Sequence, residues 1–362
     1  MLHDSSLLFQ YVLKGTITQA LLNWYGHYAR KLPWRAPYGK LQDPYIVWIS
    51  ESMLQQTMVA TVEPYFARFM TAFPTLVDLA RASLDDVLRL WQGLGYYSRA
   101  RNIHYTAHIL LKDHEGMFPN NAQHLQELPG IGPYTAAAIA SMAFGEPVVA
   151  MDANVTRVIA RLFALSDRKY CAQHAQNLCP AKYPGDFNQA LMDLGAQYCR
   201  AHQVVCTLCP LEMFCLAYRE NQPFMYPYPK EKAEKRTRYA LFFCALSGGH
   251  LLLERRPEKG LLGGLYGLPT TPWTETLQNT TPIDTPIKTV QWLLLHEITH
   301  TFTHFRLHAH ILYAQVPWRE KGNEERFLWV PYTQLAHYGI PTVFKKALKH
   351  DLIAKISKIQ KE

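Results

Sequence analysis

The turn that decides the fold of this chain reads Leu128-Pro129-Gly130-Ile131-Gly132-Pro133-Tyr134-Thr135, and an alanine-rich segment follows it. Two glycines one residue apart permit a tight turn, and proline is common at the first position of a helix. Backbone N–H groups at such a helix start can bind a phosphate without any positive side chain. A plain turn between two helices is the alternative. The stretch therefore predicts a helical hairpin.

One aspartate, Asp152, follows the alanine-rich segment, within Val149–Arg157. An aspartate at this place can cap the next helix by accepting a backbone N–H. The same carboxylate can also take part in chemistry, and the two roles are compatible.

The surrounding region, from about Thr18 to Arg219, is predicted to be all helical. Apolar residues recur at spacings of three and four, which predicts helices over Val59–Phe69, Leu84–Leu90 and Thr135–Met142. Prolines are expected to interrupt the helices, at residues that include Pro64. Alternation typical of strands is scarce, so many short helices are expected.

Four of the seven cysteines lie close together, in the order Cys199, Cys206, Cys209 and Cys215, with the spacing C-x6-C-x2-C-x5-C. Four thiolates from one loop can hold an iron–sulfur cluster or a tetrahedral zinc ion. From the spacing alone the cluster is favoured, and zinc or unligated thiols remain open. The other three cysteines, Cys171, Cys179 and Cys244, are expected to be buried apolar residues without a function.

The second half of the chain differs in character. Prolines cluster between Pro223 and Pro229 and precede a mainly basic run, which indicates a linker over residues 223–237 between domains at 1–222 and 238–362. The second domain is predicted to be α+β. It has strand-like segments at Tyr239–Leu246, Leu251–Leu253 and within Thr299–Gln315, and a terminal helix over Thr342–Ile359.

Composition limits the class of protein. Hydrophobic residues make up 48% and charged residues 18% of the 362 residues, so two folded cores are expected rather than disorder. A net charge of +8 suits a polyanionic partner, although solubility alone explains it equally well. There is no apolar run long enough for a membrane span and no secretory signal. The odd number of cysteines argues against a fully paired disulfide framework. We expect a cytoplasmic, nucleoid-associated monomer with no membrane partner.

In combination, the glycine hairpin, Asp152 and the cysteine loop resemble the helix-hairpin-helix DNA glycosylases of the endonuclease III superfamily. The resemblance implies a 4Fe–4S cluster on the four cysteines of residues 199–215. It also implies a catalytic role for Asp152 and contacts with DNA at Gly130 and Gly132.

Further motifs are similar to those of the MutY family of adenine DNA glycosylases, and the resemblance extends from about Leu21 to Leu307. They are Leu32–Arg35, Pro44–Thr57, Gly93–Asn102 and Phe187–Ala196. Members of the superfamily that also cleave the strand carry a lysine in the hairpin, which attacks the sugar as an amine nucleophile. Tyr134 stands at the matching position, and tyrosine cannot form an imine. The resemblance therefore implies a monofunctional glycosylase.

The family resemblance assigns roles to individual residues. Glu51 would protonate the adenine and then activate water, and Asp152 would stabilise the sugar cation or bond to it. Tyr134 and Asn154 would hydrogen-bond around the aspartate and the substrate. For Glu51, the alternative is an acid at a helix N-terminus stabilised by the helix dipole.

The substrate adenine must leave the base stack, and its place must be filled. Gln55, Gln56 and Tyr96 match the residues of the family that probe the duplex, with Tyr96 as the wedge. Arg99, Arg101 and Arg157 are either phosphate contacts or solvated surface charges.

The second domain begins with Leu261–Pro269, which resembles the start of a Nudix-like domain. No glutamate-rich magnesium-binding segment follows, so we expect a reader of DNA rather than a pyrophosphatase. Phe302, Thr303 and His304 resemble the loop that recognises 8-oxoguanine opposite the adenine, or guanine in its place. Histidines four apart around this loop would suggest metal ligands on a helix, but their neighbours favour strand and turn.

Two other functions remain open from the sequence. A pyrimidine glycosylase and lyase resembling endonuclease III is disfavoured by Tyr134 and by the second domain. An iron–sulfur DNA-binding protein without catalytic activity is the non-enzymatic alternative.

Overall fold

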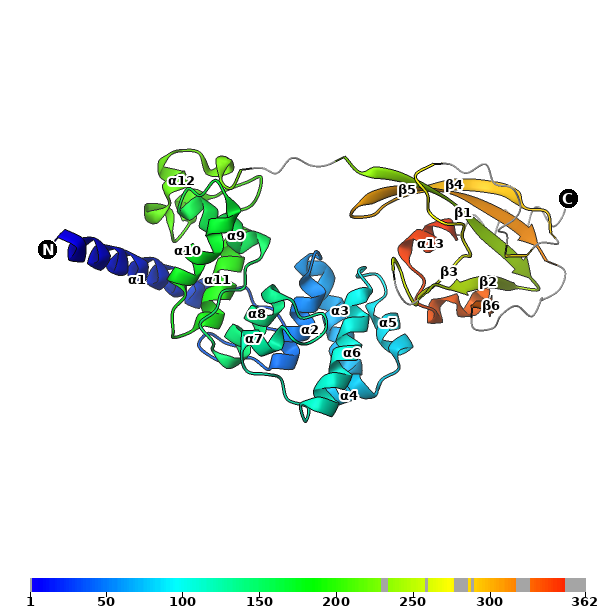
Figure 1. Ribbon diagram of the computed structural model, residues 1–362, viewed down its shortest axis with the longest axis horizontal. Helices are drawn as coiled ribbons and strands as arrows, with labels where there is room; N and C mark the ends of the chain where they lie inside the picture. The colour runs from blue at the N-terminus through cyan, green and yellow to red at the C-terminus, as the bar shows by residue number, and fades with distance from the viewer. Residues whose placement is uncertain are drawn as a thin grey trace. The chain divides into compact units, whose positions relative to one another are not determined.

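The computed structural model describes residues 2–228, 234–257, 260–276, 286–287, 290–316 and 326–348, with backbone alone at residues 2–13. The chain divides into two compact units, Met1–Ala82 with Asn102–Glu231 and Ser83–Arg101 with Lys232–Glu362 (Figure 1). Among the described residues, no helix has the length and apolar character needed to cross a membrane.

The first unit is helical throughout, as the sequence predicts. Its α-helices are α1 (Leu2–Tyr28), α2 (Pro44–Leu54), α3 (Val59–Ala72), α4 (Leu76–Arg81), most of α6 (Ser98–Asp113), α7 (Ala122–Leu125), α8 (Pro133–Phe144), α9 (Ala153–Leu162), α10 (Cys171–Leu178), α11 (Pro184–Gln197) and α12 (Leu216–Arg219). Short 3₁₀ turns lie at Arg168–Tyr170, Cys206–Leu208, Glu212–Phe214 and Pro223–Met225.

The expected helices at residues 59–69 and 135–142 are confirmed as α3 and α8, and the one at 84–90 as α5 (Leu84–Trp91) in the second unit. The expectation that Pro64 interrupts a helix is wrong, because Pro64 lies inside α3. Buried Val62, Phe66 and Phe69 on the same helix supply the packing that offsets the lost backbone hydrogen bond.

Helix α8 is the centre of the first unit. Residues 135–143 of α8 are all buried, and the helix contacts α2, α7 and α11. Small side chains, mainly alanine, let these neighbours approach closely. Helix α11 in turn contacts α1 and α9, so the elements that carry Glu51, Tyr134 and Asp152 are held around one core.

The turn between α7 and α8 is the predicted helical hairpin. Gly130 has a φ of +78°, and a Cβ atom there would lie 2.5 Å from the Cβ of Asn102. Both the backbone conformation and the close approach therefore require glycine. Gly132 is the N-cap of α8, and Pro133 begins the helix.

The second unit contains a mixed sheet, as expected for an α+β domain. Its strands are β1 (Arg236–Ser247), β2 (His250–Arg255), β3 (Tyr266–Gly267), β4 (Leu293–Thr301), β5 (Phe305–Gln315) and β6 (Phe327–Pro331). The order is β3-β2-β1-β5-β4, with β6 paired to β2. Strand β1 runs parallel to β5, and the other pairs are antiparallel.

The core of the second unit lies between this sheet and helix α13 (Thr342–Ala347). The rings of Phe242 on β1 and Phe344 on α13 are 5.0 Å apart, and Ile311 on β5 joins the same buried cluster. The expected terminal helix begins at Thr342 but ends at Ala347, since Leu348 is its C-cap. The remainder of the expectation, to Ile359, lies outside the described residues.

Candidate active site

A cavity of about 1080 Å³ in the first unit gathers most of the predicted site residues. Helices α2, α8 and α11 and the start of α9 contribute to its wall. Of the predicted residues, those that line it are Glu51, Gln55, Gln56, Gly130, Gly132, Tyr134, Asp152 and Asn154. Segments about a hundred residues apart in the sequence thus converge on one hollow.

Glu51 is a buried acid in the last turns of α2, with 6% of its surface exposed. The alternative of a helix N-terminal acid is therefore wrong. Burial raises the pKa of the Glu51 carboxyl, and the nearby Asp152 raises it further, against the opposing effects of Tyr134 and Arg35. These effects favour the protonated form of Glu51.

Tyr134, at the second position of α8, donates a hydrogen bond from its hydroxyl to Oε2 of Glu51 at 2.5 Å. The pKa of Tyr134 is raised well above its usual value, first by burial and then by the charge of Glu51. The phenol therefore stays protonated and acts as a fixed donor. It leaves Oε1 of Glu51 without a bond to Tyr134.

Asp152 is the N-cap of α9, as the sequence predicts. Its Oδ1 accepts from the backbone N–H of Val155 at 2.6 Å, and its Oδ2 accepts from Nδ2 of Asn154 at 3.0 Å. Burial raises the pKa of the Asp152 carboxyl, and the hydrogen bonds from Val155 and Asn154 act in the opposite direction. These donors and the positive end of the α9 dipole favour the ionised form, but burial outweighs them and the pKa of Asp152 remains raised.

The two carboxyl groups therefore have different environments in one cavity. Glu51 is fully buried and has one side-chain donor, whereas Asp152 is half-buried and has N–H donors at a helix start. A pair of acids whose surroundings differ in this way suits one proton donor and one anion.

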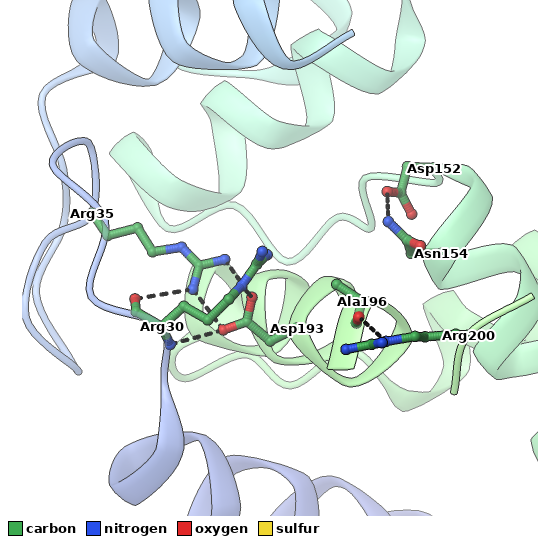
Figure 2. A network of polar contacts seen from close by, with 7 residues as sticks. All are labelled: Arg30, Arg35, Asp152, Asn154, Asp193, Ala196 and Arg200. Atoms are coloured by element: carbon green, nitrogen blue, oxygen red, sulfur yellow. Dashed lines mark hydrogen bonds and ion pairs between the residues drawn. The ribbon is translucent and has the colours of Figure 1, made fainter. Parts of the chain in front are cut away.

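Two arginines that line the cavity, Arg30 and Arg35, belong to an ion-pair network with Asp193 that sequence reasoning missed (Figure 2). Asp193 of α11 is fully buried and accepts from both terminal nitrogens of Arg35, at 2.7 and 2.8 Å, and from Nε of Arg30 at 2.6 Å. Although burial opposes it, the hydrogen bonds and charge of Arg35 hold the pKa of Asp193 below its usual value.

Arg35 also lines the cavity and acts electrostatically on Glu51. Gln189 and Met192 of α11 line the same cavity. These residues lie inside the motifs Leu32–Arg35 and Phe187–Ala196, for which the family resemblance implies no individual roles. No spacing rule connects Arg35 with Asp193, because they are far apart in the sequence.

Arg157 is neither a solvated charge nor free to follow a phosphate. Its Nε donates to the carbonyl oxygen of Cys199 at 2.7 Å, and its Nη2 donates to Oδ1 of Asn154 at 2.7 Å and to the carbonyl of Gly195 at 2.8 Å. A Cβ atom on Gly195 would lie 2.7 Å from the Cβ of Asn154. Arg157 therefore joins the loop of Cys199 to the asparagine that orients Asp152.

A second hollow, of about 990 Å³, also reaches Asp152. Four cationic side chains line it, namely Arg157, Arg161, Arg168 and Lys169, together with Ala201 and His202 from the cysteine loop. Lys169 pairs with Asp167 at 3.0 Å, so part of this charge is compensated. Arg157 and Arg161 are bonded to protein groups, so Arg168 and the partly compensated Lys169 are the cations of this hollow that suit a phosphate.

The four cysteines of the loop, Cys199, Cys206, Cys209 and Cys215, form no disulfide bonds. Cys209 lies close enough to Cys199, Cys206 and Cys215 to interact electrostatically with all three, and burial raises its pKa to about 12. A thiolate there therefore needs a bound cation.

A hydrogen-bond donor lies against a cysteine of this loop, since Nη1 of the buried Arg161 lies 3.3 Å from Sγ of Cys199. Among the described residues, no three His, Cys, Asp or Glu side chains converge on a position for a single metal ion. A 4Fe–4S cluster takes one cysteine on each iron and so spreads its ligands more widely. The donor set fits such a cluster.

The remaining predicted residues lie in the second unit. Phe302, Thr303 and His304 form the loop between β4 and β5, and Thr303 and His304 are exposed. The hydroxyls of Tyr96 and Thr303 hydrogen-bond to each other, so the expected wedge and the expected reading loop meet. The nearby histidines lie on strands, as the sequence predicts.

Comparisons with known proteins find two family matches along the chain. The model of the HhH-GPD superfamily of base excision DNA repair proteins matches residues 49–181, and a NUDIX domain model matches residues 241–350. A thermostable thymine-DNA glycosylase of known structure is 27% identical with a TM-score of 0.53, over 58% of this chain and 99% of its own.

Curated relatives cover nearly the whole chain. Adenine DNA glycosylase of Buchnera aphidicola subsp. Baizongia pistaciae is 34% identical over 349 residues, which is 94% of this chain and 96% of the relative. Adenine DNA glycosylase of Homo sapiens is 35% identical over 353 residues, 80% of this chain and 65% of the relative.

Proposed function

Because this chain belongs to the adenine DNA glycosylase family, we propose that it hydrolyses the N-glycosidic bond of adenine opposite 8-oxoguanine in duplex DNA. The observation that carries the proposal is the pair Glu51 and Asp152, which face one cavity in different protonation environments. Guanine opposite the adenine is a second substrate in this proposal.

Adenine leaves only if its charge on departure is neutralised, and Glu51 supplies the proton. Burial raises the pKa of the carboxylic acid and so favours its protonated form, and the Tyr134 hydroxyl fixes Oε2. Oε1 is then the atom that donates to a ring nitrogen of the flipped base. After the base departs, the ionised Glu51 accepts a proton from the attacking water.

Breaking the bond leaves positive charge on the sugar, and Asp152 stabilises it. The carboxylate is held by Asn154 and by the start of α9, so it does not need to reorganise as charge develops. Arg157 supports Asn154 from the other side and thereby acts as a positioning residue.

The enzyme does not cleave the strand by an amine nucleophile. Tyr134 occupies the hairpin position where a lysine would be needed, and its hydroxyl is engaged by Glu51. The product is therefore an abasic site in an intact strand.

Access to the adenine requires base flipping, and two residues that line the cavity, Gln55 and Gln56, suit it. Gln55 donates to Oγ1 of Thr135 at 3.2 Å, and Gln56 has a φ of +60°, in a turn that joins α2 to α3. Gln55, Gln56 and the wedge Tyr96 would probe the duplex, while the N–H groups near Gly130 and Gly132 bind a phosphate.

The loop of Phe302, Thr303 and His304 reads the base opposite the adenine. Its exposed hydroxyl and imidazole are donors and acceptors for the altered edge of 8-oxoguanine. The hydrogen bond between Thr303 and Tyr96 supports a joint role for the two residues.

Cys199, Cys206, Cys209 and Cys215 hold a 4Fe–4S cluster in this proposal. When bound, the cluster supplies a rigid fold for the loop next to the DNA and no substrate chemistry. Arg161 donates toward Cys199, and Arg157 holds its backbone.

The test uses duplexes with adenine opposite 8-oxoguanine and opposite thymine. We expect adenine release from the first duplex, with strand breaks only after alkali. Direct strand cleavage, or release of oxidised pyrimidines instead of adenine, would contradict the proposal. Unchanged base release by Asp152→Asn would assign the activity to a contaminant and leave this chain as a DNA-binding protein.

A further inference from the structure

A group of cations lies around the loop Phe302–His304 and has no part in the chemistry described above. The parallel pairing of β1 with β5 sets Arg236 beside Phe305, Thr237 beside Arg306 and Arg238 beside Leu307. Residues from the end of the linker are thereby brought to the base of the loop.

Lys235 is attached to the loop itself, because its Nζ donates to the carbonyl oxygen of Phe302 at 3.0 Å. The ammonium group has two further N–H donors, and the side chain is exposed. The guanidinium of Arg238 lies 4.7 Å from the centre of the Phe305 ring, and Arg306 is exposed on β5.

Aromatic packing fixes the loop that these cations surround. The rings of Phe302 and Phe305 stack at 4.7 Å, and Trp273 lies 5.6 Å from Phe302. The loop therefore has a rigid base.

Internal ion pairs do not neutralise the positive charges around the loop. Arg236 pairs with Glu275 at 3.1 Å, but in the described part of the chain no carboxylate lies within ion-pair distance of Lys235, Arg238 or Arg306. These cations are therefore available to an anion that approaches the loop from solution.

We infer that Lys235, Arg238 and Arg306 bind phosphates of the DNA strand that carries the base read by the Phe302–His304 loop. The inference rests on the proposed function, because that function brings duplex DNA to this loop. Phosphate contacts fix register without reading sequence, so these cations would hold the opposite base against Thr303 and His304.

The experiment measures binding of the full-length chain by fluorescence anisotropy between 50 and 200 mM NaCl. The probe is a duplex with non-hydrolysable 2′-fluoro-2′-deoxyadenosine opposite 8-oxoguanine, and a second duplex has guanine there. Each phosphate contact contributes about 0.9 to the slope of log Kd against log salt. We expect Lys235→Gln and Arg306→Gln each to lower the slope by about one, and the double variant by about two.

Two controls separate phosphate binding from general effects. Arg326 is an exposed cation beside β6, which pairs with β2 and not with β5, so Arg326→Gln should keep the wild-type slope. Lys235→Arg keeps the charge and should restore the slope that Lys235→Gln loses. Thermal unfolding followed by circular dichroism checks that each variant is folded.

The inference is overturned if Lys235→Gln and Arg306→Gln keep the wild-type slope, or if Arg326→Gln lowers it equally. Failure of the proposed function gives a different result, in which the wild-type chain binds the 8-oxoguanine and guanine duplexes equally. The slope test applies in either case because both duplexes carry the same phosphates.

Discussion

The hydroxyl of Tyr134 lies 2.5 Å from Oε2 of Glu51, so that a phenol at the start of α8 orients a buried acid at the end of α2. In the proposed reaction, the position that would hold a nucleophilic amine in a strand-cleaving relative orients the general acid instead. One residue thereby accounts for both the presence of base release and the absence of strand cleavage in the proposed reaction.

Glu51→Gln removes the proton donor and keeps the shape and burial of the side chain. We expect base release under single-turnover conditions to fall by about 10²- to 10⁴-fold, while affinity for the 8-oxoguanine duplex is retained. Glu127 is an exposed acid close to the hairpin, and Glu127→Gln should leave the rate unchanged. Retention of more than about a tenth of the activity by Glu51→Gln would exclude general acid catalysis by this residue.

Glu51 should also make stability depend on pH. Its pKa is raised by burial, so the folded state binds the proton more tightly than the unfolded state. The stabilising contribution is complete below the unfolded pKa and is lost as pH rises through the folded pKa. We expect Glu51→Gln to match the wild type in urea unfolding at low pH and to exceed it at alkaline pH. Equal pH profiles would mean that Glu51 is not buried in its protonated form.

Asp152 combines a structural role with a chemical one, and two variants separate them. Asp152→Asn and Asp152→Ser can both accept the Val155 N–H as helix caps, but neither carries charge. We expect both to lose base release by at least about 10²-fold with unfolding free energies within about 1 kcal/mol of the wild type.

A cap elsewhere provides the converse control. Thr75 caps α4 through the N–H of Asp78, and Thr75→Ala should lower stability by about 1 kcal/mol without slowing base release. If Asp152→Asn instead behaves like Thr75→Ala, then Asp152 is a cap and nothing more.

The buried acid Asp193 should be essential for stability. Asp193→Asn leaves Arg35 with an incomplete partner in the interior, and removal of one member of a buried pair costs about 3–5 kcal/mol. Because the pKa of Asp193 is lowered, its contribution is present at neutral pH and disappears as pH falls through the folded pKa.

The exposed pair of Asp86 and Arg89, at 2.9 Å, is the matched comparison. Asp86→Asn should change the free energy of unfolding by less than about 1 kcal/mol. Similar losses for the two variants would show that the Arg35 network is screened by water.

Substitution of the cysteines tests the cluster. Cys209→Ser should abolish the visible absorption of iron–sulfur centres in the purified protein and lower its yield of folded chain. Cys244→Ser, at a buried position in the second unit, should keep that absorption. An absorption spectrum unaffected by Cys209→Ser would contradict the assignment of the ligands.

The sequence predicts those features that depend on neighbours along the chain. The hairpin at Gly130 and the cap at Asp152 follow from local backbone rules and are confirmed. Pro64 was mistaken for an interruption because burial of one face of α3 outweighs the local preference.

The features that sequence reasoning missed depend on tertiary contacts. Arg35 meets Asp193, and Arg157 meets Cys199, across separations that no motif spacing records. The two interpretations of Glu51 depend on where its helix begins. Helix α2 begins after the Asp43 cap, which places Glu51 in the last turns of the helix and not at its N-terminus.

The parallel register of β1 and β5 has a consequence for how the second unit folds. The loop Phe302–His304 cannot reach its native conformation until β1 and β5, which are far apart in the sequence, have paired. Its assembly is therefore a late and slow event. A nascent or truncated chain that stops before Phe305 exposes the hydrogen-bonding edge of β1, rich in buried apolar residues, and such edges recruit other chains. Fragments of this kind should therefore aggregate.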